Sequence, residues 1–187
     1  MMTLRYMAVQ FFNSLMHDIR TITVISDTHG VIDDQITSVL NDSDLIVHAG
    51  DIMSTSIIKK LKTYSGRVIA VAGNNDLPER YPDEEDKKII SELKKVEQFS
   101  INNKLVTVEH GDRFGHHPSH ADLRAAHPDS KLIIYGHTHN QVCDKSQIPW
   151  VVNPGAAGHT RNNDGGPCYM QILIDNDKWE IKSHCIK

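Results

Sequence analysis

Seven side chains of types that bind metal ions stand at the ends of apolar runs in this sequence: Asp27, His29, Asp51, Asn74, His110, His137 and His139. Carboxylate, imidazole and amide groups together suit manganese, iron, zinc, nickel or cobalt better than calcium or magnesium. Two such ions, about 3.5–4 Å apart, can hold a phosphate and lower the pKa of a bound water toward about 7. The residue types therefore indicate hydrolysis of a phosphate ester at a two-metal site.

The apolar runs of the first half are predicted to be buried parallel strands. They are ITVIS (22–26), DLIVHAG (44–50) and RVIAVAG (67–73). Two helical segments separate them, one opening at Asp33-Asp34 and the other capped by Ser54 or Thr55. Strands that are apolar throughout, joined by helices, are typical of parallel sheets. Because ligands of open α/β sheets gather at the carboxyl ends of the strands, we expect the polar residues to converge there.

The second half reads as hairpins and further strands. VEQFSI and KLVTVEH flank Asn102-Asn103, which favours a tight turn, and a helix is expected over 117–127. KLIIYG, PWVVN, CYMQILI and KWEIKSH are four more expected strands, and a surface helix is expected within 83–95. Parallel units followed by hairpins predict two mixed sheets packed face to face, with helices outside.

Length and composition fit one globular domain, assigned to residues 21–187, after an N-terminal extension (1–20) that is disordered or helical. The net charge of −4 argues against bulk nucleic-acid binding, and no run is long enough to span a membrane. Three cysteines without a paired motif, Cys143, Cys168 and Cys185, fit a reducing compartment better than a disulfide framework. We therefore expect a cytoplasmic protein.

The polar residues also form an ordered pattern: Asp27-x-His29, Gly50-Asp51, Gly73-Asn74-x-Asp76, His110-Gly111 and Gly136-His137-x-His139. From Thr21 onward this pattern resembles the five motif blocks of calcineurin-like metallophosphoesterases. The short chain and the Asn153-Pro154-Gly155 segment are similar to the small bacterial and archaeal phosphodiesterases of that family. The resemblance implies a four-layer α/β/β/α sandwich, attack on phosphorus by a metal-bridging hydroxide, and a homodimer as a family-level expectation.

The resemblance also assigns roles to residues. The first metal would be bound by Asp27, His29 and His139, the second by Asn74, His110 and His137, with Asp51 bridging the two. Manganese is the expected metal, and nickel, zinc, iron and cobalt are compatible with the ligand types. The implied catalytic set is Asp51, Asn74, Asn75, Asp76 and His110.

One residue departs from the pattern of many family phosphatases. Asn75 stands where those enzymes carry a histidine that protonates the leaving group, and an amide cannot deliver a proton at neutral pH. This favours leaving groups that need little protonation, such as aryl or nucleoside esters. The leading expectation, from the resemblance, is a phosphodiesterase acting on a small or nucleotide-like ester. A phosphomonoesterase with the same site and a non-catalytic interaction scaffold of the same fold are the alternatives.

Several roles stay open at the level of sequence. Asp76 could orient the site or cap a turn, and His48 could be a core group, a support for the site or a ligand. The histidines at 116, 117 and 120 could line a substrate cleft or lie on an exposed loop, and Arg161 could reach a substrate phosphate.

Overall fold

The computed structural model describes residues 19–64, 67–158 and 165–187. Nearly all of the predicted N-terminal extension and the segment containing Arg161 lie outside these ranges. None of the helices within them has the length and apolar character that a membrane span requires.

Two five-stranded mixed sheets form the centre of the molecule. The first has the order β10-β9-β1-β2-β3. Its parallel strands are β1 (Thr21–Ile25), β2 (Leu45–His48) and β3 (Val68–Ala70), and its antiparallel hairpin is β9 (Cys168–Asp175) with β10 (Lys178–Cys185).

The second sheet has the order β4-β5-β6-β8-β7. Its strands are β4 (Val96–Ile101), β5 (Lys104–Glu109), β6 (Leu132–Ile134), β7 (Gln141–Asp144) and β8 (Trp150–Pro154). Strands β5, β6 and β8 run parallel, so their carboxyl ends share one edge of this sheet.

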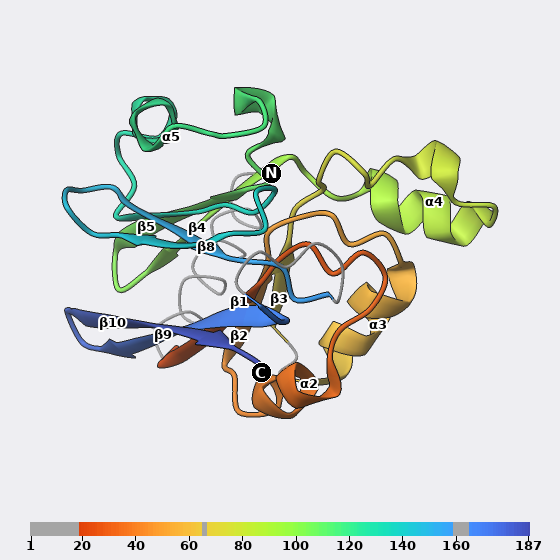
Figure 1. Cartoon of the computed structure of the whole chain (residues 1–187), viewed down its shortest axis with the longest axis horizontal. Helices are drawn as coiled ribbons and strands as arrows, with labels where there is room; N and C mark the ends of the chain where they lie inside the picture. Colours follow the sequence, from red (N-terminus) through yellow and green to blue (C-terminus); the bar gives the residue numbers. More distant parts are fainter. Residues whose placement is uncertain (1–18, 65–66, 159–164) are drawn as a thin grey trace, which may run out of the picture.

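Helices cover the outer faces of both sheets (Figure 1). Helices α2 (Asp34–Leu40) and α3 (Thr55–Tyr64) lie against the first sheet, and α5 (His120–Ala126) lies against the second. Helix α4 (Glu84–Ser91) follows the short 3-10 helix η1 (Pro78–Arg80) beside α3, and a second 3-10 helix, η2 (Asp112–Phe114), follows β5.

Three apolar clusters correspond to the three interfaces between these four layers. Val24, Val47 and Val106 belong to the cluster between the sheets. Ile36 of α2 packs in the cluster outside the first sheet, and Leu123 of α5 packs outside the second. Alternate residues of a strand point to opposite faces, so each sheet can contribute to two interfaces. The four-layer α/β/β/α sandwich of two mixed sheets is confirmed.

The structure corrects the sequence predictions at three places. The helix expected from residue 117 begins only at His120, because Pro118 precedes it and Ser119 caps it by accepting the backbone N–H of Asp122. Strand β7 was not predicted, since QVCD is short and lacks an apolar run.

The third correction concerns the cysteines, which were expected to be unpaired. Cys168 and Cys185 form a disulfide, and Cys143 is free and exposed. The antiparallel pairing of β9 with β10 places these two residues directly opposite one another, with Cα atoms 4.2 Å apart. A separation of 17 residues gave no sign of this proximity in the sequence.

Candidate metal centre

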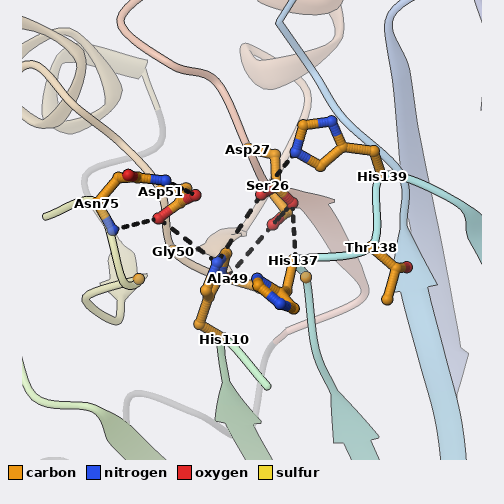
Figure 2. A network of polar contacts seen from close by, with 12 residues as sticks. Ser26, Asp27, Ala49, Gly50, Asp51, Asn75, His110, His137, Thr138 and His139 are labelled. Carbon is orange, nitrogen blue, oxygen red and sulfur yellow. Dashed lines mark hydrogen bonds and ion pairs between the residues drawn. The ribbon is translucent and has the colours of Figure 1, made fainter. Parts of the chain in front are cut away.

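Six of the seven predicted ligand residues lie together, where the carboxyl ends of the parallel strands of both sheets meet. They are Asp27, His29, Asp51, His110, His137 and His139. The first three follow β1 and β2 of the first sheet, and the other three follow β5 and β6 of the second. Figure 2 shows the Asp27 side chain between the histidines of the second sheet. The site therefore spans the interface between the sheets.

Two groups of possible metal ligands share Asp27. One combines Asp27 with His29 and His139, and the other combines it with Asp51 and His110; the donor atoms of each group lie within 4.8 Å of one another. The Nε2 atoms of His29 and His139 are 3.1 Å apart, and Asp27 Oδ1 lies 3.3 Å from His139 Nε2. Asp27 is thus the carboxylate common to both groups, whereas the resemblance assigns the bridging role to Asp51.

Two buried atoms at the centre of the cluster have no hydrogen-bond partner among the described residues, namely Asp27 Oδ1 and His110 Nε2. Both residues are essentially inaccessible to solvent. A buried polar atom without a partner costs on the order of 1–3 kcal/mol, and more when it is charged. Because carboxylate oxygens and imidazole nitrogens are metal ligands, a cation bound here would satisfy both atoms, and the residues present fit a metal centre.

The electrostatics of the cluster also favour a cation. Burial lowers the pKa of His110, but the Asp51 and Asp27 carboxylates raise it more, to about 9. Burial raises the pKa of Asp51, yet the neighbouring His110 imidazole, whose Nε2 lies 3.4 Å from Asp51 Oδ1, and hydrogen bonds from Asn75 bring it below its usual range. Burial, followed by the charge of His110, lowers the pKa of His137. Negative charge therefore predominates between Asp27 and Asp51, where a positive charge is stabilised.

The backbone at the cluster is unusual. Five of the predicted ligand residues have positive φ angles between 45° and 71°: Asp27, His29, Asp51, His137 and His139. This left-handed conformation is uncommon outside glycine, and such residues concentrate at functional sites. Gly73 is required for a different reason, because a Cβ there would lie 2.2 Å from Asp51 Oδ1.

Asp76 supports the loops that carry these residues. Its carboxylate accepts the backbone N–H groups of Ile52, Met53 and Gly73 at 3.1, 2.8 and 2.9 Å. It therefore joins the loop after β2 to the loop after β3, next to Asp51. Between the two roles open for Asp76, these contacts favour orientation of the site.

His48 is a second support. The Gly50 N–H donates to His48 Nδ1 at 3.3 Å, so the ring proton resides on Nε2, which donates to Thr28 Oγ1 at 3.0 Å. The Thr28 hydroxyl in turn donates to the carbonyl of Ile52 at 3.2 Å. Burial lowers the pKa of His48 to about 4, so the ring is neutral at pH 7. Both nitrogens are used within the protein, and His48 connects the loops after β1 and β2.

The second-sheet histidines are held by hydrogen bonds to the first sheet. His110 Nδ1 donates to the carbonyl of Ala49 at 2.8 Å, which leaves its Nε2 facing the two carboxylates. The backbone N–H of His137 donates to Asp27 Oδ2 at 3.0 Å, as Figure 2 shows. The first bond fixes the orientation of the His110 imidazole, as is usual for a histidine that binds a metal, and the second fixes the backbone at His137.

Asn75, rather than Asn74, contacts the cluster. The Asn75 backbone N–H and side-chain amide donate to the two oxygens of Asp51 at 2.9 and 2.7 Å, whereas the Asn74 side chain is exposed. Arg80 donates from Nη1 to Asn75 Oδ1 at 2.9 Å and is exposed to solvent. Arg80 was missed by the sequence analysis, because a single loop arginine gives no motif signal.

Comparison with known proteins identifies the family. A model of the calcineurin-like phosphoesterase superfamily domain matches residues 21–177. This chain belongs to that superfamily. A phosphodiesterase of Methanocaldococcus jannaschii is 29% identical over 143 residues, which cover 72% of this chain and 82% of that relative.

Solved structures agree with this membership. The structure of an archaeal phosphodiesterase is 27% identical, with a TM-score of 0.65 over 89% of this chain and 99% of that one. A Vps29 variant from Entamoeba histolytica is 18% identical, with a TM-score of 0.69 over 89% of this chain and 99% of its own. The likeness to Vps29 shows a common fold.

The loop after β5 carries the remaining histidines near this calcineurin-like site. His116 is exposed and stacks on His137, with ring centroids 6.3 Å apart and an interplanar angle of 11°. His117 is also exposed, whereas His120 is paired with Asp144 at 2.7 Å. Of the three histidines with open roles, only His116 has a ring contact with a predicted ligand among the described contacts.

Proposed function

We propose that this member of the superfamily is a two-metal phosphodiesterase that hydrolyses a small or nucleotide-like phosphate ester. The observation that supports it most is the pair of donor groups sharing Asp27, with Asp27 Oδ1 and His110 Nε2 buried and lacking hydrogen-bond partners among the described residues. An interaction scaffold has no need for such groups, whereas two metal ions would satisfy them.

Asp27, His29 and His139 would hold one ion, and His110 and His137 the other, with Asp51 between them. Asn74 completes the second set by family resemblance, although its side chain is exposed. Bound ions would supply Lewis acidity, which makes water a better nucleophile and neutralises charge on the phosphoryl oxygens. Manganese is the proposed metal, because the mixed oxygen and imidazole ligands suit it.

The residues beside the candidate metal centre favour an ester with an acidic leaving group. Asn75 cannot protonate a leaving group, so esters of acidic alcohols or phenols should react fastest. The guanidinium of Arg80, which uses one N–H for Asn75, has further donors that can bind a phosphate oxygen. The phosphodiesterase activity named for the Methanocaldococcus relative supports a diester as the substrate.

Metal removal and two substrates test the proposal. The protein is stripped with a chelator and reloaded with manganese, and the hydrolysis of bis(4-nitrophenyl) phosphate is compared with that of 4-nitrophenyl phosphate. We expect no turnover without metal, recovery with manganese, and a higher kcat/KM for the diester. A higher kcat/KM for the monoester would indicate a phosphomonoesterase, and a stripped protein that stays inactive after reloading with each compatible metal would contradict the proposal.

A further inference from the structure

Large apolar side chains are exposed at four positions among the described residues, and three of them lie beside the candidate metal centre. Val31 is 51% exposed, and Met53 and Leu77 are each 40% exposed. Val31 follows His29 by two residues, Met53 follows Asp51 by two, and Leu77 directly follows Asp76. We call Val31, Met53 and Leu77 the apolar row.

The apolar row follows the order of the strands. Its members lie on the loops after β1, β2 and β3, which are neighbours in the first sheet. The Gly30 N–H donates to the Ile52 carbonyl at 2.8 Å, which ties the first loop to the second. Asp76 ties the second loop to the third through the Met53 N–H. The three side chains therefore lie on adjacent, connected loops.

The side chains of the apolar row are exposed although the backbone of their loops is held by hydrogen bonds. The Met53 backbone is held by Asp76, and its sulfur lies 3.0 Å from His29 Nδ1, on the ring whose Nε2 faces His139. The Leu77 backbone N–H donates to the Asn75 carbonyl at 3.0 Å, and Val31 donates to the Thr28 carbonyl at 3.0 Å. Fixed backbone with exposed apolar side chains is a feature of ligand-binding surfaces.

The fourth exposed residue provides a contrast. Ile148 is 63% exposed and lies in the connection between β7 and β8, just before β8 begins. Because β8 runs parallel to β5 and β6, its start lies at the opposite edge of the second sheet from the metal centre. A single exposed apolar residue is ordinary on a protein surface, whereas three beside one polar cluster are not.

We propose that the apolar row binds an aromatic or other apolar ester group of the substrate while its phosphate lies at the metal centre. This inference rests on the proposed function and names the substrate class: a phosphodiester with an apolar organic group next to the phosphate. The absence of a proton donor at Asn75 concerns the leaving group instead, which should be an acidic alcohol or phenol. Arg80, at the end of η1 shortly after Leu77, donates to Asn75 and would supply positive charge for the phosphate.

The test compares two diesters with the same leaving group, 4-nitrophenyl phenyl phosphate and methyl 4-nitrophenyl phosphate. For the manganese-loaded protein we expect kcat/KM to be about tenfold higher for the phenyl ester, from burial of the added apolar surface. The variant Val31→Ser/Leu77→Ser should reduce this ratio to about two or less. This double variant retains Met53 and its contact with His29. The contribution of Met53 is measured in a separate variant, Met53→Ser.

Two further measurements complete the design. Isothermal titration calorimetry should show that phenylphosphonate binds more tightly than methylphosphonate, which tests the phenyl preference without turnover. The matched control is Ile148→Ser, which should retain the phenyl preference. No phenyl preference in the unsubstituted protein, or a preference that survives in all row variants, would overturn the inference. A change of oligomeric state in the double variant with the preference retained would identify the row as a contact between copies instead.

The two proposals fail in different ways. Hydrolysis of both esters at equal efficiency contradicts the proposed role of the apolar row and leaves the proposed function intact. Absence of hydrolysis of every ester contradicts the proposed function, and the phosphonate titrations then still decide whether the row binds the apolar group.

Discussion

Glu109 and His110 are adjacent in the sequence, both are buried, and they belong to two different kinds of polar cluster. Glu109 is the last residue of β5, and its carboxylate contacts Arg113 and His127, the C-cap residue of α5. His110 contacts Asp27 and Asp51 at the metal centre. Successive side chains at a strand end point to opposite sides of the sheet, so one strand supplies both clusters.

The two clusters differ in how many of their polar atoms have hydrogen-bond partners within the protein. Arg113 Nε and His127 Nε2 each lie 2.6 Å from an oxygen of Glu109, and Arg113 Nη2 lies 3.1 Å from Oε1. At the metal centre, Asp27 Oδ1 and His110 Nε2 have no hydrogen-bond partner among the described residues, and neither lysine nor arginine contacts Asp27 in the ion pairs described. The Glu109 cluster contains its own counter-charge in Arg113, whereas the candidate metal centre would leave that position for an ion.

Substitution within the metal centre should have the largest effect. Asp51→Asn or His110→Ala removes a predicted ligand, so we expect turnover to fall by several orders of magnitude while the fold is retained. The loss of function is measured by the turnover of bis(4-nitrophenyl) phosphate and by the metal content. Retention of the fold is measured by the circular dichroism spectrum. Near-native activity in both metal-loaded variants would remove the proposed site.

Glu109→Gln should show the opposite behaviour. It removes the negative charge that pairs with Arg113, and breaking a buried ion pair costs about 3–5 kcal/mol. Because the Arg113 side chain is 49% exposed and can be solvated, we expect a smaller loss, about 2 kcal/mol of unfolding free energy. Denaturant titration measures the loss, and metal content should not change. Loss of metal without loss of stability would show that the two clusters are not separate.

A pH-dependent effect is expected for His48, a buried imidazole whose two nitrogens are both used within the protein. Its folded-state pKa of about 4 lies below its ordinary value of 6.5, so its contribution to stability is present above pH 6.5 and is lost as the pH falls toward 4. The loss amounts to about 1–3 kcal/mol. His48→Gln cannot be protonated in this range and should flatten this part of the stability profile.

Thermal unfolding of metal-free protein between pH 7 and 4 measures the effect of His48. The His48→Gln variant should lose less stability than the unsubstituted chain over this interval. Equal losses in both proteins would show that His48 does not contribute to acid sensitivity.

Six of the seven ligand residues expected from the sequence lie together in the structure, whereas several of the residues around them were not expected. Asp27, His29, Asp51, His110, His137 and His139 were all named because each comes at the end of an apolar run, and strand ends of one sheet must meet. Arg80, Glu109 and His127 gave no signal in the sequence, because their contacts cross between elements that no local pattern connects. The same reason hid the Cys168–Cys185 bond, which depends on the pairing of β9 with β10.

By itself, the sequence determined the secondary structure of most of the chain and the kinds of ligand at each strand end, because apolar periodicity and residue chemistry are local properties. Only the tertiary structure decided which atoms remain without partners, which carboxylate both donor groups share, and which apolar side chains stay exposed beside them. These features depend on how two sheets pack against one another. That packing is fixed by the summed burial of side chains distant in the sequence, as when Val24 of β1 and Val106 of β5 enter one cluster.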